Sequence, residues 1–395
     1  MEHYEILGLD LGVENNQVVG QVTGELSKEL SLFFSLFLAQ LNKNKVLASK
    51  NGSNIYSLFL PSLPSNAGTR ELIRKLMRKF FHRRIPATLT FAVTYHCQAT
   101  CIHCSSEQHK SAGKEELSTS ECQRVIDQAL DLGVINIVFT GGEPLLRKDI
   151  FQLIKHVDKD RAICNMFTNG QYLTDDNIEK LLEAGIYALL VSLDSPDPEK
   201  HDSWRRIPGL FEMTTAGIQR ALKAGILTGI STYISREGLA AGDHEKMMEL
   251  GRQLGVHEVI FFDTLPAGRF RDNYEGLLTM EDKEVIRDFT NKYLYDTQYP
   301  GIITQAWINH PKGSGCFAGN EQFYITAYGD VCPCDFTPLS FGNIREAELK
   351  DICDKMLKHE EYREKRAHCR VQDPIFRSKY LSTIPTGAPL PYLLT

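Results

Sequence analysis

The chain has 395 residues, a formal net charge of −6 and a hydrophobic content of 42%. Its length allows two or three domains, and its composition is ordinary for a globular protein. The acidic balance excludes a general electrostatic attraction to nucleic acid, so we expect no nucleic-acid partner. Because the N-terminus lacks a basic start followed by an apolar stretch, we expect a cytoplasmic protein.

Residues 1–88 form the first of five predicted regions. They contain two strand-like stretches, at 4–9 and 17–22, and a leucine- and phenylalanine-rich run at 30–41. The run is shorter than the roughly 20 residues that span a bilayer. The region ends in a basic amphipathic helix at 70–84, for which three roles stay open. In the first role the helix packs on the next domain. In the second it contacts anionic lipid at the inner membrane surface, and in the third it helps to recognise a peptide.

Residues 89–270 form the second region, in which strands and helices alternate. Six apolar strands are predicted, at 90–95, 135–141, 162–170, 187–194, 227–235 and 257–264. Five helices are predicted between them, at 118–133, 149–158, 174–185, 211–224 and 243–255. Apolar strands joined by helices indicate a buried parallel sheet with right-handed crossovers. We therefore predict an α/β fold, a partial (β/α)6 barrel whose chemistry lies at the carboxyl ends of its strands.

Three further regions follow the barrel. Residues 271–312 are predicted to hold a linker helix and loops. Residues 313–372 hold a β-hairpin around Gly329, a helix and half of the ten cysteines. Residues 373–395 contain the proline-rich stretch 385–391 and are predicted to form a loop-like tail.

A set of three cysteines follows the first predicted strand. Cys97, Cys101 and Cys104 form a CxxxCxxC pattern in one loop. Disulfides are not expected without an export signal, so metal binding is the first interpretation. An iron–sulfur cluster usually takes four cysteines, and three would leave one iron open to a small molecule. The alternative is a zinc site completed by His103 or His109.

The sequence Gly141-Gly142-Glu143-Pro144 follows the second predicted strand. A CxxxCxxC loop after the first strand and GGEP after the second resemble the radical S-adenosylmethionine (SAM) superfamily. The resemblance implies that the three cysteines hold a 4Fe–4S cluster whose open iron binds SAM. It further implies reductive cleavage of SAM to a 5′-deoxyadenosyl radical, which abstracts a hydrogen from the substrate.

The resemblance also implies roles for polar residues at the strand ends. Gly141 and Gly142 would let the backbone approach SAM closely, and Glu143 would accept a hydrogen bond from the SAM ammonium group. Asn169 and Ser192 would contact the SAM carboxylate or ribose.

The resemblance leaves the roles of five further residues open. Asp194 would reach the adenosine or the substrate. Arg205 and Arg206 stand where the family often has Arg-Gly, so either arginine can face the site. Thr232 and Asp263, near the ends of the last two strands, are weaker candidates.

A second set of cysteines lies in residues 313–372. The hairpin and helix there resemble the SPASM or "twitch" extension of radical SAM enzymes, which holds auxiliary 4Fe–4S clusters. The full extension has seven cysteines, so we expect one auxiliary cluster here, held by Cys316, Cys334 and Cys369. Cys332 becomes the fourth ligand if the strand places it on the same face as Cys334. Otherwise the fourth iron stays open and binds the substrate.

The other three cysteines are predicted to be buried thiols. Cys122 and Cys353 lie on apolar helix faces, and Cys164 lies within a predicted strand.

The resemblance implies an oxidoreductase or modifying enzyme that receives electrons from a donor such as flavodoxin or ferredoxin. As substrate we expect a peptide or protein first, then a lipid or isoprenoid, then another small metabolite. A non-catalytic iron–sulfur electron-transfer protein is the remaining alternative. The GGEP motif disfavours it, because electron transfer alone needs no SAM pocket.

Overall fold

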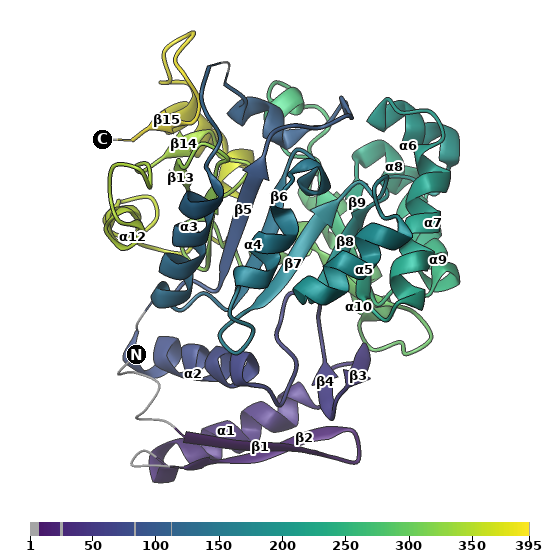
Figure 1. Ribbon diagram of the computed structural model, residues 1–395, viewed down its shortest axis with the longest axis vertical. Helices are drawn as coiled ribbons and strands as arrows, with labels where there is room; N and C mark the ends of the chain where they lie inside the picture. The colour runs from purple at the N-terminus through teal and green to yellow at the C-terminus, as the bar shows by residue number, and fades with distance from the viewer. Residues whose placement is uncertain (1–7, 24–26, 83, 112, 395) are drawn as a thin grey trace.

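The computed structural model describes residues 8–23, 27–82, 84–111 and 113–394. Its centre is a nine-stranded sheet in the order β11-β10-β9-β8-β7-β6-β5-β12-β13 (Figure 1). Neighbouring strands from β11 to β12 pair in parallel, and β13 pairs with β12 in antiparallel orientation. The strands are β5 (Thr88–Thr94), β6 (Asn136–Gly141), β7 (Ile163–Thr168), β8 (Ala188–Ser192), β9 (Leu227–Ile234), β10 (Glu258–Asp263), β11 (Gly301–Thr304), β12 (Gln322–Ile325) and β13 (Val331–Cys332).

The six predicted strands are β5 to β10, so the α/β class and the partial barrel are confirmed. The sheet extends beyond them on both sides. β11 lies in residues 271–312, where only a helix and loops were predicted, because four residues are too few to show a strand periodicity. On the other side β12 pairs with β5, so the cysteine-bearing region continues the barrel sheet.

The crossover helices cover the outer face of the sheet, as Figure 1 shows for α3, α4 and α5. Leu89, Phe91 and Val93 of β5 belong to the same buried core as the apolar residues of these helices. A capping box of Ser118 and Glu121 begins α3. The helices are α3 (Thr119–Leu132), α4 (Ile150–His156), α5 (Asp175–Ala184), α6 (Pro198–Arg205), α7 (Leu210–Lys223), α8 (Arg236–Ala240), α9 (Asp243–Leu254), α10 (Met280–Leu294) and α11 (Gln305–Ile308).

The elements before the barrel form what we call the N-terminal module. They are β1 (Gly8–Glu14), β2 (Gln17–Thr23), α1 (Ser27–Leu41), β3 (Ala48–Lys50), β4 (Ser53–Ile55) and α2 (Asn66–Phe81). The module has its own core between α1, α2 and β2, which includes Phe34 and Leu72. Its connection to the barrel is the fully buried Leu58, whose N–H donates to Glu258 at the start of β10 (3.0 Å). The module therefore lies at the amino ends of the barrel strands, away from the expected site.

The basic face of α2 is only partly exposed to solvent. Arg74 is buried and pairs with Glu71 (2.7 Å), and Arg78 pairs with Glu321 beside β12 (2.6 Å). Two of the arginines of α2 thus make ion pairs within the fold, which fits a helix that packs on the next domain. Leu32 and Leu36 of α1 are exposed instead, with relative exposures of 72% and 61%. Within the described ranges, the model contains no helix of the length and apolarity needed to cross a membrane.

The C-terminal residues return to the barrel rather than forming only a loop. β14 (Leu339–Ser340) pairs in parallel with β15 (Tyr392–Leu393), so the end of the chain lies beside the cysteine-bearing region. Between them lie α12 (Leu349–Lys358), η4 (Arg370–Gln372), α13 (Pro374–Phe376) and η5 (Arg377–Leu381). The predicted loop-like tail thus contains two short helical segments and a strand.

Candidate active site

The three predicted cluster ligands lie in the cluster loop (95–104), which leaves the carboxyl end of β5. Cys101 is buried, Cys97 and Cys104 are half-buried, and all three thiols are free. Burial, together with the charges of Glu143, Cys101 and Cys104, raises the pKa of Cys97 to about 11. Cys97 is therefore an electrostatic neighbour of the other two thiols and of the GGEP glutamate.

The segment after β10 holds the cluster loop in place. Arg269 donates a side-chain hydrogen bond to the carbonyl of Cys101 (2.7 Å), and its backbone N–H donates to the carbonyl of Cys104 (3.1 Å). Gly268 has a φ of 58°, and a Cβ there would collide with the Cys104 carbonyl. Sequence reasoning missed Gly268 and Arg269, because they lie far from the cysteines in the chain and in no motif.

Gly141 and Gly142 bring the end of β6 against the start of the cluster loop. The N–H of Gly142 donates to the carbonyl of Thr94 (2.7 Å), and a Cβ on Gly142 would collide with the carbonyl of His96. A Cβ on Gly141 would likewise collide with the Thr94 carbonyl. The close approach that glycine permits is thus to the protein's own backbone, which fixes the loop beside Glu143.

Glu143 is buried and held in one orientation by three hydrogen bonds. Its carboxylate accepts from the hydroxyl of Thr168 (2.9 Å) and from the backbone N–H groups of Asn169 (2.9 Å) and Leu145 (3.2 Å). Burial raises the pKa of Glu143, and these donors oppose that rise. A cationic group bound beside this carboxylate would remove the cost of burying its charge.

Asn169 and Ser192 lie at the ends of neighbouring strands, as predicted. The side-chain oxygen of Asn169 accepts from the N–H of Gln171 (3.0 Å), whereas its buried amide nitrogen has no partner among the described residues. An unpaired buried donor is rare in a folded protein, so it marks a place where a ligand oxygen fits. Ser192 is half-buried and ends β8.

Asp194 lies at the centre of a buried ion-pair cluster. Arg205 bonds both of its carboxylate oxygens (2.6 and 2.9 Å), and His103 of the cluster loop lies 3.2 Å away. Burial opposes ionisation, but Arg205 and His103 outweigh it and hold the pKa of Asp194 well below its usual range. Arg205 is therefore the arginine that faces the site. Arg206 is exposed and ends α6 with a φ of 56°.

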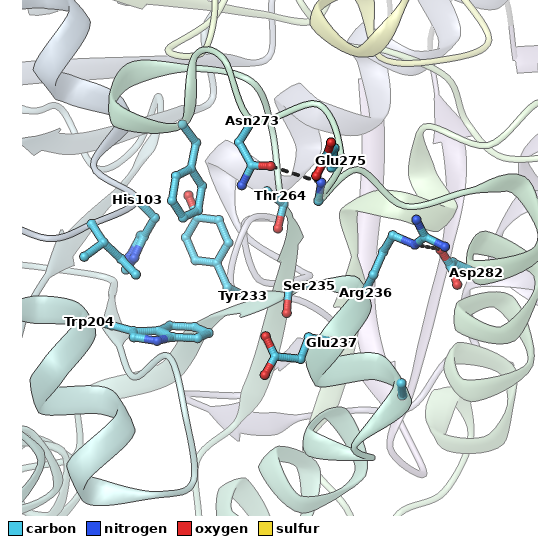
Figure 2. Close-up of a pocket in the computed structure, with 14 residues that line it drawn as sticks. His103, Trp204, Tyr233, Ser235, Arg236, Glu237, Thr264, Asn273, Glu275 and Asp282 are labelled. Atoms are coloured by element: carbon cyan, nitrogen blue, oxygen red, sulfur yellow. Dashed lines mark hydrogen bonds and ion pairs between the residues drawn. The ribbon is translucent and has the colours of Figure 1, made fainter.

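A cavity of about 690 Å³ adjoins the cluster loop. Figure 2 shows His103, Trp204 and Tyr233 on one side of it and Arg236, Glu237 and Asp282 on the other. His103 packs against Tyr233 with a centroid separation of 4.5 Å. The cavity thus combines an aromatic wall next to the cysteines with charged groups farther out.

The cysteines of the second set do not form a single group. Cys316 and Cys334 lie in one small buried cluster. Burial raises the pKa of Cys369, and the neighbouring Cys316 and Cys334 raise it further, so these three thiols are mutual neighbours. Cys332 lies in a different cluster with Tyr95, Tyr324 and Tyr328. β13 ends at Cys332, so the two cysteines do not share a strand face, although the charge of Cys334 acts on Cys332; Cys332 as a ligand stays a prediction.

The remaining cysteines and the two histidines of the zinc alternative have other places in the fold. Cys122, Cys164 and Cys353 are buried in the main core, where the sequence predicted them. His103 is engaged with Asp194, and Nε2 of His109 contacts the Asp335 carbonyl at 3.0 Å, so both histidines of the zinc alternative have other partners. Within the described ranges, no three His, Cys, Asp or Glu side chains converge on a single metal ion. A cluster needs wider spacing, because each thiolate binds a different iron.

The donor set fits a 4Fe–4S cluster with SAM. Cys97, Cys101 and Cys104 supply three thiolates from one loop and leave one iron position without a protein ligand. Glu143 offers a fixed carboxylate for an ammonium group, and the unpaired amide of Asn169 offers a donor for a carboxylate or ribose oxygen.

Models of two protein families match the chain. The radical SAM superfamily matches residues 91–262, and the SPASM iron–sulfur cluster-binding domain matches residues 316–372. Among curated proteins, the AdoMet-dependent heme synthase of Methanosarcina barkeri is 29% identical over 287 residues, which are 68% of this chain and 82% of that protein. The PqqA peptide cyclase of Rhizobium meliloti is 28% identical over 276 residues, 68% of this chain and 73% of that protein.

Solved structures share the fold. Streptococcus suis SuiB bound to its precursor peptide SuiA superposes with a TM-score of 0.58 at 16% identity, over 85% of this chain and 77% of that one. anSMEcpe with bound AdoMet has a TM-score of 0.54 at 17% identity, over 71% of this chain and 83% of that one.

These matches identify the cofactors as a 4Fe–4S cluster with SAM and auxiliary iron–sulfur in the C-terminal region. The curated relatives are enzymes. The chain thus belongs to the radical SAM superfamily and is a radical SAM enzyme with a C-terminal SPASM extension.

Proposed function

We propose that this enzyme modifies a peptide or protein substrate. When bound, the cluster and SAM supply a 5′-deoxyadenosyl radical that removes a hydrogen atom from the substrate. The cluster loop and Glu143 hold the two cofactors, and the cavity beside His103 receives the reacting side chain. Cys316, Cys334 and Cys369, to which we assign the auxiliary site, would hold an iron–sulfur cluster able to accept an electron from the substrate. A protein such as flavodoxin or ferredoxin supplies the reducing electron.

The charge of the cavity wall is the observation from which we infer the class of substrate. Glu237 and Glu275 are exposed carboxylates on its wall, and Asp282 adds a third, which is paired with Arg236 (3.2 Å). A wall with more carboxylates than cations attracts neutral or basic groups and repels anions. The cavity therefore suits a peptide with lysine or arginine near the reacting residue.

A heme precursor is the second candidate, because AdoMet-dependent heme synthases are among the relatives. Heme carries carboxylate groups of its own, which the acidic wall of the cavity would repel. The wall thus favours the peptide.

The N-terminal module supports the peptide proposal independently. The structural match to SuiB spans 85% of the chain, a share that the residues after 88 alone cannot supply. In the described part of the module, β1 and β2 form a two-stranded sheet without further strands. The edge of such a sheet can pair with an extended peptide.

Lipid contact through the exposed Leu32 and Leu36 is the other role that we consider for this module. Liposome flotation of the native chain and of a variant with both leucines changed to Ser tests it.

The test uses reduced enzyme, SAM and two peptides that differ only in lysine or glutamate beside the target residue. We expect release of 5′-deoxyadenosine above the peptide-free rate, and a change in peptide mass, for the lysine peptide. Glu237→Gln with Glu275→Gln should raise KM for that peptide, whereas Glu281→Gln, an exposed change outside the cavity wall, should not. Stimulation by a heme precursor and by neither peptide would overturn the proposal.

A further inference from the structure

Three buried polar atoms without partners belong to residues linked to Cys316, Cys334 and Cys369. Within the described ranges, Oδ1 of Asp263, the hydroxyl of Tyr362 and one terminal nitrogen of Arg370 have no hydrogen-bond partner. Their residues are at most 2% exposed. Buried polar atoms are nearly always paired, so three such atoms on residues linked to these thiols indicate a missing group.

Each orphan is connected to the three thiols. Arg370 follows Cys369 directly, and its guanidinium lies 4.7 Å from the centre of the Tyr362 ring. The charges of Cys334 and Cys316 act on the buried hydroxyl of Tyr362. These two residues offer hydrogen-bond donors, whereas Oδ1 of Asp263 is an acceptor, and a carboxylate oxygen of this kind can bind a metal.

Asp263 is fixed beside Cys369 by a short chain of contacts. It ends β10, and its Oδ2 accepts from the side chain of Gln372 (2.6 Å). Gln372 closes the single turn η4 that begins directly after Cys369, and Lys283 donates to its other amide atom (2.9 Å). With Oδ2 occupied in this way, Oδ1 is the carboxylate oxygen left without a partner among the described residues. The charge of Asp263 acts on Cys369 together with those of Cys316 and Cys334.

The cysteines that remain are poorly placed for a fourth ligand. Cys332 lies among tyrosines, and of the three assigned thiols only Cys334 is among its electrostatic neighbours. Cys353 lies on α12 in the main core.

We propose that Asp263 is the fourth protein ligand of the auxiliary cluster, through Oδ1, alongside Cys316, Cys334 and Cys369. Tyr362 and Arg370 donate hydrogen bonds to its sulfur atoms. A carboxylate is a harder and more readily exchanged ligand for iron than a thiolate. The ligand set therefore gives the cluster one distinct iron at the carboxyl end of β10, facing the barrel. This inference rests on the proposed auxiliary ligands and not on the identity of the substrate.

The test isolates the auxiliary cluster in the full-length chain. Changing Cys97, Cys101 and Cys104 to Ala leaves only the second set, and Asp263→Asn, Asp263→Cys and Cys332→Ala are then compared in that background. The measurements are iron per chain, Mössbauer and EPR spectra, and midpoint potential, all without SAM or substrate. Failure to act on a peptide therefore has no bearing on this result.

We expect the background protein to hold about four irons and Asp263→Asn to fall to about three, because the distinct iron loses its ligand. Asp263→Cys should keep all its iron and show a lower potential, since a thiolate donates more charge to iron than a carboxylate does. Cys332→Ala should behave as the background does.

Three results would overturn the proposal. The first is an Asp263→Asn protein with unchanged iron, spectra and potential. The second is loss of iron from Cys332→Ala, and the third is a background protein that binds no iron. If Asp263→Asn does not fold, as judged by circular dichroism, the midpoint potential of Asp263→Cys decides whether residue 263 binds the cluster. An unchanged potential there also refutes the ligand role.

Discussion

Arg205 gives the most exact test of how the barrel holds the cluster loop. Its guanidinium forms two hydrogen bonds to the buried Asp194, which also lies 3.2 Å from His103 between two cluster cysteines. Changing Arg205 to Met keeps most of the side-chain volume but removes the charge that offsets the buried carboxylate. Removing one partner of a buried ion pair costs about 3–5 kcal/mol.

The assay is urea unfolding of the cluster-free protein, followed by circular dichroism. We expect Arg205→Met to lower the free energy of unfolding by about 3–5 kcal/mol. The neighbouring Arg206 is the matched control, because it is exposed and its backbone already has a positive φ. Arg206→Gly should be neutral or slightly stabilising, since glycine adopts that φ without strain.

A double variant separates the ion pair from simple loss of packing. Adding Asp194→Leu to Arg205→Met removes the unpaired charge and should recover part of the stability. A loss below about 1 kcal/mol for Arg205→Met, the size expected of an exposed pair, would refute the reasoning.

Four further changes test other parts of the account. Glu143→Gln should weaken SAM binding about 10- to 100-fold, as measured by anaerobic equilibrium dialysis, because a hydrogen bond to a charged group is worth about 1.5–3 kcal/mol. Gly142→Ala should lose most of its cluster iron, since its Cβ meets the His96 carbonyl, whereas Gly12→Ala, with ordinary contacts, should lose none. Burial lowers the pKa of His109 to about 4 from the usual 6.5, so between these values the unfolded chain takes up a proton that the folded chain does not. Stability should therefore fall on acidification by up to about 1.4 kcal/mol per pH unit, and His109→Gln should remove that part of the slope. Burial raises the pKa of Glu258 to about 7 from the usual 4.5, so between these values the folded chain keeps a proton that the unfolded chain releases. The free energy of unfolding therefore falls as the pH rises from 4.5 to 7. Glu258→Gln should be more stable than the native chain at pH 8, by about 3 kcal/mol in urea unfolding; an unchanged or lower stability would contradict this.

The barrel strands and the positions of the cysteines could be predicted from the sequence because their signals are local. Strands such as β7 and β8 are continuous apolar runs, and Cys97, Cys101 and Cys104 lie within one loop. The carboxyl-end rule then brings Glu143 and Asn169 to the same edge without any knowledge of contacts.

Contacts between distant segments could not be predicted. Nothing in the sequence shows that Arg269 binds the cluster loop, or that Arg205 rather than Arg206 turns inward. The separation of Cys332 from Cys334 depends on where β13 ends, and an element boundary is a weak sequence signal. The sequence alone offers little reason to single out Asp263 as a site residue. Its unpaired oxygen is recognised only in the structure, where Gln372 bonds the other oxygen.

The central claim is that Cys97, Cys101 and Cys104 hold the cluster that cleaves SAM. It is tested most directly by reducing the reconstituted enzyme with dithionite in the presence of SAM and measuring 5′-deoxyadenosine and methionine. We predict release of both products from the native chain. Cys97→Ala should release neither, and Cys122→Ala, a change to a buried core thiol, should release both. A native chain that holds its iron, accepts electrons and yields no 5′-deoxyadenosine would contradict the account.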